Sequence, residues 1–393
     1  MTSGMTHAIT QFVEILLWAS LGAIIYSYLF YPLLVALIVR VVGKRATSSD
    51  DAYLPSVSVV VSLYNEEAVL PEKLRNLDAL EYPTDRIRFL LGSDGSTDRT
   101  NELLAAWKTP AGRVVCFPRR RGKGPTLNDL MAEATGEVVV FSDANTLFEP
   151  GTVRRLVCRL ADPAVGAVCG ELILKAEEND TGGIGETSYW SYENWLKRME
   201  SDFDTLLGAT GGVYAIRRSL YVPLPPGKSV TDDFLIPLKI VMQGFRVIYA
   251  RDAVAFERTS GSMRGEFRRK ARIGAQNFSV IGEIAPLLSP AAGFTAFALW
   301  SHKIIRWCVP FLAIAAFLAT ACLAPVSAFY GWMFALELGF LLLGGAGFAA
   351  DRWKLDIGSA GLPYYILAMN LALLVGFFRF LARRQDATWE VLR

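Results

Sequence analysis

The chain has 393 residues, of which 52% are hydrophobic and 20% are charged, a composition more apolar than that of an ordinary soluble enzyme. The formal net charge is only +2, which argues against a protein that binds nucleic acid or another polyanion over its whole surface. The composition therefore predicts a globular domain combined with membrane segments.

The first predicted element is an apolar run over residues 12–42, longer than the roughly 20 residues that a helix needs to cross a hydrocarbon core. Residues 1–11 contain no Lys or Arg, whereas Arg40, Lys44 and Arg45 accompany the end of the run. A cleaved signal peptide has a shorter apolar stretch preceded by basic residues. We therefore expect a retained transmembrane helix, and the positive-inside rule places the domain that follows in the cytoplasm.

Residues 50–255 have the pattern of one α/β domain. Val57–Leu63 is β-branched and apolar on both faces, as is typical of a central parallel strand, and Leu70, Leu74 and Leu77 follow at helical spacing. The same unit recurs, with strands expected at 88–91, 114–117 and 138–141 and helices beginning near 98 and covering 125–134. Alternating strands and helices predict a doubly wound, mainly parallel sheet.

Several common kinds of site are excluded by residue types and spacing. The first strand is followed by Ser62–Glu66 instead of a glycine-rich dinucleotide turn, and Gly122–Gly124 lacks the earlier glycine of a P-loop. The two histidines, His7 and His302, lie outside the domain, which excludes a Ser-His-Asp mechanism and His-ligated zinc within it. The five cysteines have neither metal-ligand nor disulfide-framework spacing, consistent with a reducing compartment.

Acidic residues and small turn residues recur where predicted strands end, and these ends form the ligand crevice of an open α/β sheet. Asp143 and Asn145 follow the fourth strand, where oxygen ligands can seat a divalent cation that holds a diphosphate, although an Asp at a strand end is more often part of a turn or a helix cap. Asp94 ends the second strand; an Asx turn is the alternative, although it suits Asp98 better. The glycine-flanked Lys123 can approach a diphosphate, or lie in a solvated basic loop.

The motifs, in their order and spacing, resemble those of the family 2 glycosyltransferases, which have a GT-A fold. The matching segments are Tyr64–Glu66, Asp94–Asp98, Gly122–Lys123 with Leu127–Asn128, Ser142–Thr146 and Thr231–Asp233. The membrane plan is similar to that of chitooligosaccharide, hyaluronan and cellulose synthases. The resemblance implies a cytosolic GT-A domain with transmembrane helices before and after it, in a bacterial inner membrane, and Mg²⁺ or Mn²⁺ as cofactor.

The resemblance also assigns residues to the nucleotide sugar and to its metal. The implied contacts with the nucleotide sugar are Tyr64, Glu66, Asp94, Lys123 and Asp143. Asp143 corresponds to the first acid of the family's metal motif, and Asn145 replaces the second acid with a neutral oxygen. The predicted metal site therefore carries one negative charge less than usual.

Catalysis is assigned to the segment Thr231–Asp233, which stands where the synthases carry Thr-Glu-Asp. Asp233 becomes the candidate general base, and the neighbouring Asp232, together with burial, is expected to raise its pKa. The resemblance further implies that Arg272 neutralises the departing diphosphate, because it matches the arginine of the synthases' Gln-x-x-Arg-Trp motif.

The chain departs from the synthases around that arginine, since the aligned residues are Arg269–Ile273 and both the Gln and the Trp are missing. This departure puts the synthesis of long chains in doubt. Residues 258–273 also fit an amphipathic helix that meets lipid headgroups. The implied acceptor-binding residues are Gly211, Gly212 and Arg269, although a tight turn that needs positive φ explains the glycines of 208–217 equally well.

Three aromatic residues, Trp190, Tyr192 and Trp195, can stack on sugar rings, but aromatic residues on a helix are more often part of a core or face lipid, and we do not assign them to a site. Further apolar runs occur near 304–324, 331–350 and 361–381. We expect four spans. One span before the domain and three after it place the C-terminus outside, whereas Arg379, Arg383 and Arg384 favour a cytoplasmic C-terminus. Either residues 280–300 make an extra crossing, or the terminal arginines lie on the far surface of the membrane.

The domains expected from the whole chain are an N-terminal transmembrane helix (12–42), a cytosolic GT-A domain (50–255), amphipathic interface helices (256–300), about three transmembrane helices (304–381) and a tail (382–393). The expected function is inverting transfer from a UDP-sugar to a growing polysaccharide or oligosaccharide. One-step glycosylation of a lipid or lipid-linked acceptor is an alternative, and a non-catalytic scaffold of a secretion complex is another. Membrane lipids and secretion-complex proteins are the expected partners, and no nucleic acid is expected.

Overall fold

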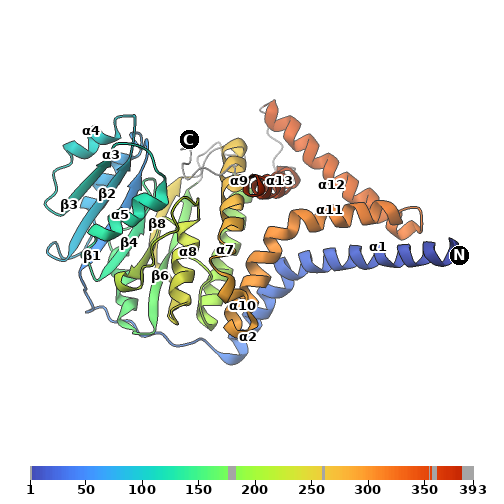
Figure 1. Cartoon of the computed structure of the whole chain (residues 1–393), viewed down its shortest axis with the longest axis horizontal. Helices are drawn as coiled ribbons and strands as arrows, with labels where there is room; N and C mark the ends of the chain where they lie inside the picture. The colour runs from blue at the N-terminus through green and yellow to red at the C-terminus, as the bar shows by residue number, and fades with distance from the viewer. Residues whose placement is uncertain (1, 176–182, 259–261, 354, 356–360, 383–393) are drawn as a thin grey trace.

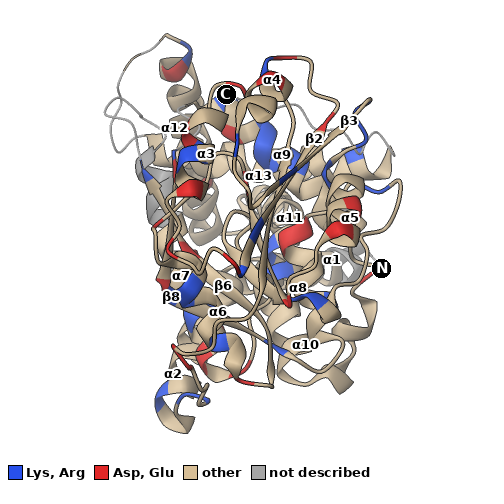
Figure 2. Ribbon diagram, turned by 90° about the vertical axis from the view of Figure 1, so that its left-hand side faces the viewer, with Lys and Arg blue, Asp and Glu red and all other residues tan. Residues whose placement is uncertain are grey.

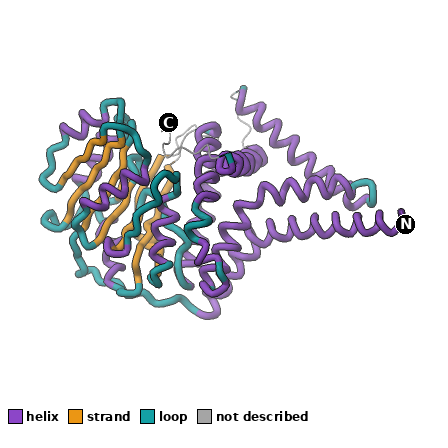
Figure 3. Tube along the Cα trace, in the orientation of Figure 1, coloured by secondary structure: helices purple, strands orange, loops and turns teal. Residues whose placement is uncertain are grey.

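The computed structural model describes residues 2–175, 183–258, 262–353, 355 and 361–382. A sheet domain with helices on both faces occupies one end, and long helices extend away from it (Figure 1). The same division is seen in Figure 3, where all strands lie at one end and the opposite end consists of helices and short connections.

The sheet has eight strands in the order β3-β2-β1-β4-β7-β6-β8-β5. Their bounds are β1 Val57–Leu63, β2 Ile87–Asp94, β3 Gly112–Phe117, β4 Val138–Ser142, β5 Leu147–Phe148, β6 Val165–Lys175, β7 Tyr214–Arg217 and β8 Arg246–Arg258. Strands β3, β2, β1 and β4 run parallel to one another, and β6 is parallel to β8. Strand β7 lies between β4 and β6 and is antiparallel to both, and the edge strand β5 is antiparallel to β8. The predicted mainly parallel α/β sheet is confirmed.

The central position of β1 follows from its side chains, because every residue of Val57–Leu63 is buried. Val59 and Val61 pack with the face covered by α3, α4 and α6, whereas Val60 packs with the face covered by α5, α7 and α8. A strand that is covered on both faces needs apolar residues at successive positions, and this explains the continuous apolar run.

The helices within and around the sheet domain are α3 Leu70–Asp78, α4 Thr100–Ala106, α5 Lys123–Glu133, α6 Thr152–Val157, η2 Cys158–Ala161, α7 Gly183–Phe203, η3 Arg218–Leu220, α8 Asp232–Val241 and α9 Met263–Ser279. The remaining helices are α1 Thr2–Ile25, η1 Tyr26–Phe30, α2 Tyr31–Val42, η4 Ala285–Leu288, η5 Pro290–Ala292, α10 Phe294–Ala298, η6 Leu299–Ile304, α11 Ile305–Leu323, α12 Ala328–Arg352 and α13 Gly361–Leu381.

Within the described residues, four helical segments are long and apolar enough to cross a membrane: His7–Val42, Phe294–Leu323, Ala328–Arg352 and Gly361–Leu381. Large apolar side chains such as Phe12, Trp332 and Leu336 are exposed on them, as expected for helices whose outer surface meets lipid. Charged residues are concentrated elsewhere, and Lys and Arg are prominent on α9 (Figure 2). The second candidate span, Phe294–Leu323, begins ten residues earlier than the apolar run expected at 304, because α10, η6 and α11 are continuous.

Helix α9 is held against the candidate membrane helix α13 by a close backbone approach at Gly376. A Cβ atom at this position would lie 2.6 Å from the carbonyl oxygen of Ala271 and 2.8 Å from the backbone nitrogen of Ala275. Phe278 adds an edge contact with Phe377, with ring centroids 5.0 Å apart. The position of α9 therefore depends on a glycine in α13.

We expect Gly376→Ala to separate α9 from α13 and to destabilise the protein by about 1–3 kcal/mol, as overpacking commonly does. Thermal unfolding of the purified protein in detergent measures the loss. Gly345→Ala is the matched control, because a Cβ atom there meets nothing within 4 Å. Equal unfolding temperatures for the two variants would show that the close approach at Gly376 does not hold α9.

Candidate active site

Acidic and basic side chains from three elements meet at the carboxyl edge of the parallel strands. Lys123, the first residue of α5, donates to Asp143 Oδ1 at 2.8 Å and pairs with Asp232 Oδ2 at 3.1 Å. Asp143 follows β4, whereas Asp232 and Asp233 open α8. The structure thus brings together residues that are up to about 110 positions apart in the sequence, such as Lys123 and Asp232, as the crossover connections of a parallel sheet allow.

The surroundings of Gly211 show that the carboxylates of Asp143 and Asp233 lie close to one point. A Cβ atom at Gly211 would lie 3.1 Å from Asp233 Oδ2 and 3.3 Å from Asp143 Oδ2. At Gly212 a Cβ atom would lie 2.2 Å from the hydroxyl oxygen of Thr146. Neither glycine has positive φ, so the turn explanation is wrong for both and applies only to Gly208, with φ 126°. These glycines are needed for close approach to the aspartates and to the 143–146 loop.

Asp94 occupies the end of β2 and is almost fully buried. Its carboxylate accepts the backbone N–H groups of Arg121 at 2.9 Å and Gly122 at 2.7 Å. In this conformation Asp94 therefore shapes the loop that carries Lys123, and its contact with a nucleotide stays a prediction. Asp98 accepts from the backbone of Thr100 at 3.0 Å, as the expected Asx turn requires.

The charges of the site shift the protonation of its carboxyl groups in opposite directions. Burial, reinforced by Asp232, raises the pKa of Asp233 to about 6. Burial also raises the pKa of Asp232, against the effect of Lys123. Burial opposes the ionisation of Asp143, but Lys123 outweighs it and holds the pKa of that carboxyl below its usual value. One carboxyl group is therefore kept ionised while its neighbour titrates near neutrality, a pattern found where acid–base chemistry is performed.

Arg272 belongs to α9, the helix that packs against α13, and completes the charged cluster. Burial and the neighbouring Arg269 lower the pKa of the Arg272 guanidinium, and the negative charges of Asp143, Asp232 and Asp233 oppose this shift. Arg269 itself forms a bidentate pair with Glu266, with N···O distances of 2.6 and 2.9 Å. The predicted phosphate arginine thus belongs to the cluster, whereas the predicted acceptor arginine is engaged within its own helix.

The predicted nucleotide-binding residues after β1 lie at the same edge. The Arg120 guanidinium lies over the Tyr64 ring, 3.7 Å from its centroid. The backbone N–H of Glu66 donates to the hydroxyl of Thr100 at 2.8 Å. Asn65 between them has φ 52°, and its side-chain oxygen accepts from the backbone of Thr97 at 2.8 Å. The segments that follow β1, β2 and β3 therefore contact one another around Tyr64.

Two residues of the site were not predicted from the sequence. Lys73 on α3 is fully buried and its ammonium donates to the Ser142 hydroxyl at 2.6 Å and to the Thr146 carbonyl, on both sides of Asp143. Its position between Leu70 and Leu74 on the apolar stripe is the signal that could have found it, because an unpaired Lys is rarely buried. Glu257 of β8 accepts from the Asn145 amide at 2.9 Å, a long-range contact with no local sequence signal.

The residues around Asp143 fit a small divalent cation. A carboxylate and an amide oxygen are the hard ligands that Mg²⁺ and Mn²⁺ take, and such ions use few protein ligands when a substrate diphosphate supplies the rest. Glu257 engages the nitrogen of the Asn145 amide, so that the oxygen is the atom that remains for a cation. The Lys123 ammonium on Asp143 shows that the position already attracts a positive charge. Among the described residues no three His, Cys, Asp or Glu side chains form a metal cluster of their own.

Comparison with known proteins gives a family match for the sheet domain. Residues 58–222 match the family model named glycosyl transferase family 2. Over these residues the chain resembles a family 2 glycosyltransferase domain. The curved α/β sheet agrees with the GT-A fold of such domains, and the candidate membrane helices lie before and after it.

Proteins similar to this chain include the probable glycosyltransferase YdaM of Bacillus subtilis (strain 168), 25% identical over 237 residues, covering 58% of this chain and 56% of the relative. The poly-beta-1,6-N-acetyl-D-glucosamine synthase of Staphylococcus aureus (strain COL) is 26% identical over 227 residues, covering 56% of this chain and 54% of the relative. The chain thus matches about half the length of these curated relatives.

A solved structure is similar over nearly the whole chain. The mannosyltransferase PcManGT from Pyrobaculum calidifontis, in complex with GDP-Man and Mn²⁺, is 25% identical with a TM-score of 0.69. The match covers 96% of this chain and 99% of that one. The similarity therefore extends beyond the sheet domain to the helices outside it.

Proposed function

We propose that this protein is a metal-dependent, inverting glycosyltransferase of the membrane that transfers a sugar from a nucleoside diphosphate sugar to an acceptor hydroxyl. The observation that carries the proposal is that the carboxylates of Asp143 and Asp233 both lie against Gly211, with Lys123 bound to Asp143. Asp143 then lies at the diphosphate of the donor, and Asp233 accepts the proton of the acceptor hydroxyl.

The reaction needs a base for the acceptor and positive charge for the leaving group. The acceptor oxygen forms a bond with the anomeric carbon, its proton passes to Asp233, and the bond from that carbon to the diphosphate oxygen breaks. Lys123 and Arg272 stabilise the charge that develops on the departing diphosphate. A bound Mg²⁺ or Mn²⁺ at Asp143 and Asn145 would add Lewis-acid stabilisation of the same charge. Because a single displacement suffices, no covalent intermediate is needed and the anomeric configuration inverts.

The donor we propose first is a UDP-sugar, held by Tyr64, Glu66 and Asp94 together with Lys123 and Asp143. A GDP-sugar is the second candidate, because the structure similar over 96% of this chain is a complex with GDP-Man. Incubation of the purified protein with a panel of UDP-sugars and GDP-sugars, with Mn²⁺ or with EDTA, tests both through the release of UDP or GDP. Release from no donor would overturn the proposed function and favour a non-catalytic scaffold.

The acceptor we propose is a glycan or lipid-linked glycan presented at the membrane surface, near Gly211, Gly212 and the positively charged α9. The relatives include a poly-beta-1,6-N-acetyl-D-glucosamine synthase, which supports polysaccharide extension. The residues Arg269 and Ile273 at the positions of the missing Gln and Trp favour short products or one transfer to a lipid. Size separation of radiolabelled products distinguishes a long polymer from a single transfer.

The arrangement in the membrane that we propose has the sheet domain and α9 on the cytoplasmic side of a bacterial inner membrane, with the four apolar segments as spans. Cysteine accessibility in intact cells tests this orientation. A cysteine introduced in place of the exposed Asp85 should react with a membrane-impermeant reagent only after cell lysis. Labelling in intact cells would reverse the orientation.

We expect Asp143→Ala to weaken binding of the donor in the presence of Mn²⁺ by at least about tenfold, because a charge-assisted ligand of the cation and of Lys123 is lost. Calorimetric titration with UDP, with and without Mn²⁺, measures the change. In EDTA, wild type and variant should bind UDP with more similar affinities. An unchanged effect of Mn²⁺ in the variant would remove Asp143 from the metal site.

The rate of transfer should depend on pH through Asp233. Because a general base must be deprotonated and the pKa of Asp233 is about 6, we expect kcat to fall about tenfold for each pH unit below 6 and to level off above 7. Rates from pH 5 to 8 at saturating donor and Mn²⁺ measure the profile. A rate that stays constant from pH 8 down to 5 would contradict the role of Asp233 as the base.

A further inference from the structure

A cavity of about 340 Å³ lies between α7, residues 171–174 at the end of β6, and Tyr249 and Arg251 of β8. Its lining combines two tryptophan rings with polar side chains of both signs and with neutral ones. The members that matter for its chemistry are Glu171, Trp190, Asn194, Trp195, Arg198 and Tyr249. None of them serves the chemical step proposed above.

The register of the sheet places this cavity at the same edge as the catalytic residues. Cys169 of β6 and Phe141 of β4 are both level with Tyr214 of β7. Glu171 therefore stands two residues beyond that level, as Asp143 does on its own strand. Strand β8 is the other neighbour of β6, and its Glu257, which accepts from the Asn145 amide, is paired with Leu174 of β6.

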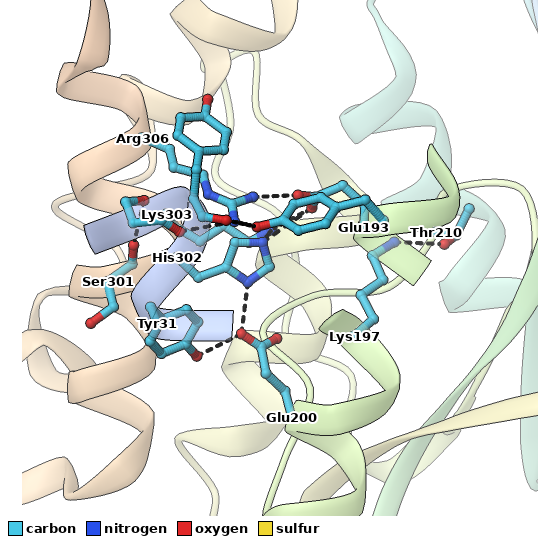
Figure 4. A network of polar contacts seen from close by, with 12 residues as sticks. Tyr31, Glu193, Lys197, Glu200, Thr210, Ser301, His302, Lys303 and Arg306 are labelled. Carbon is cyan, nitrogen blue, oxygen red and sulfur yellow. Dashed lines mark hydrogen bonds and ion pairs between the residues drawn. The ribbon is translucent and has the colours of Figure 1, made fainter. Parts of the chain in front are cut away.

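Helix α7 connects the cavity with the glycine segment of the active site. The Lys197 ammonium donates to the Thr210 hydroxyl at 2.9 Å and lies over the ring of Trp190, 5.3 Å from its centroid. Thr210 precedes Gly211, and Figure 4 shows Lys197 reaching toward Thr210 from α7. Trp190 thus borders the cavity, and Lys197, whose ammonium lies over its ring, binds Thr210 next to Gly211.

Three polar atoms of the lining are buried without a hydrogen-bond partner among the residues that the structure describes. They are Tyr249 Oη, Asn194 Oδ1 and Arg198 Nε. A buried polar atom without a partner costs about 1–3 kcal/mol, and a native protein retains such atoms mainly where a ligand or water completes them. An acceptor oxygen, a donor nitrogen and a hydroxyl are the partners that sugar hydroxyl groups need.

We propose that this cavity binds the saccharide part of the acceptor, at a distance from the hydroxyl that reacts, so that it is an acceptor subsite of the proposed glycosyltransferase. Trp190 and Trp195 offer apolar ring faces to the sugar, and Tyr249, Asn194 and Arg198 hydrogen-bond its hydroxyl groups. The lining also contains Arg251, 3.9 Å from Glu171, so that Arg198 is its further cation and the experiment below separates a saccharide from an anionic group. The assignment rests on the proposed function, since the acceptor must be a glycan.

Tyr249→Phe tests the assignment with little risk to folding, because the hydroxyl that it removes has no partner within the described structure. Membranes that contain the protein are given the labelled nucleotide sugar that supports nucleotide release, and label is counted in glycan product and in free sugar. We expect Tyr249→Phe and Asn194→Ala each to reduce incorporation into product about tenfold. Release of free sugar by hydrolysis should stay at the wild-type rate, because the donor site is unchanged.

The matched control is Tyr82→Phe, which removes a buried hydroxyl that donates to the Pro55 carbonyl at 2.6 Å, before the start of β1. This variant should lose thermal stability and keep the wild-type ratio of product to free sugar. A wild-type ratio for Tyr249→Phe and Asn194→Ala would overturn the subsite. A loss confined to Arg198→Gln would indicate an anionic lipid headgroup and would overturn the saccharide assignment. If wild type neither releases nucleotide nor incorporates label, the proposed function itself fails.

Discussion

Asp233→Asn should abolish most of the transferase activity while leaving the donor bound, with kcat reduced by about 10²–10⁴-fold, the usual contribution of a positioned general base. The amide has the shape of the carboxylate but cannot take the proton of the acceptor hydroxyl. Asp143 and Lys123 keep their own contact at 2.8 Å in the variant, so the affinity for the nucleotide should change little. Single-turnover transfer and equilibrium binding of UDP measure the two quantities separately.

The variant should also be at least as stable as wild type, which excludes unfolding as the cause of lost activity. Burial raises the pKa of Asp233 from 3.8 to about 6, so the folded state favours the protonated form. The stabilisation from protonation is fully present below about pH 3.8 and is lost as the pH rises through about 6. At pH 7 the wild type therefore holds an unfavourable buried charge, and a neutral amide relieves it. Activity loss accompanied by a lower unfolding temperature would point to a structural role instead.

Asp78→Asn is the matched control for this substitution. Asp78 ends α3 and accepts from the Trp107 indole nitrogen at 3.0 Å, and an asparagine oxygen can accept the same bond. The control should therefore have wild-type activity and stability. Native-rate transfer by Asp233→Asn would show that another group takes the proton.

The first half of the sheet could be predicted because its information is local. Each of the strands β1 to β4 is a short apolar run followed by turn residues, and helical spacing separates the runs, so that 57–63 and 138–141 were located almost to the residue. Strands β6, β7 and β8 were not located, since β6 is paired on both sides with partners about fifty and eighty residues away. Pairing at such distance is decided by packing and not by any pattern within the strand.

The candidate site was predictable in its carboxylates and not in its supporting contacts. Asp143 was recognisable because acids and turn residues recur wherever a predicted strand ends, and Asp233 was recognisable through the resemblance of Thr231–Asp233 to the Thr-Glu-Asp segment of the synthases. The burial of Asp94 under the backbone of Arg121 and Gly122 depends on how one loop folds over another strand, which spacing does not encode. The same holds for Lys73 beneath the metal loop and for the close contacts of Gly211 and Gly212.

The contact between the sheet domain and the membrane helices is a polar network that the sequence did not predict. Its central residue is Glu193 of α7, which pairs with Arg306 and lies 3.1 Å from His302 Nε2, while the other ring nitrogen of His302 lies 2.7 Å from Glu200 (Figure 4). The Tyr31 hydroxyl donates to Glu200 at 2.8 Å. The network thus joins α7 to η6, α11 and α2.

Glu193→Ala should be among the most destabilising single substitutions in the protein. The side chains of Glu193 and Arg306 are 9% and 7% exposed, and removal of one partner of a buried ion pair leaves the other charge without compensation, which costs about 3–5 kcal/mol. Arg306 would keep its bond to the Tyr192 hydroxyl at 2.7 Å, but this neutral partner does not offset the charge. Thermal unfolding in detergent should show a large decrease for Glu193→Ala and a smaller one for Glu193→Gln, which can still accept hydrogen bonds.

Glu149→Ala provides the comparison that separates this effect from the loss of an ordinary surface pair. Glu149 lies 2.7 Å from Arg155, with side chains 35% and 43% exposed, and such a pair contributes about 0–1 kcal/mol. Because α7 also carries Lys197, whose ammonium holds Thr210 beside Gly211, a shift of α7 in Glu193→Ala should lower transfer as well as stability. If Glu193→Ala and Glu149→Ala unfold at the same temperature, the network does not hold the sheet domain to the membrane helices.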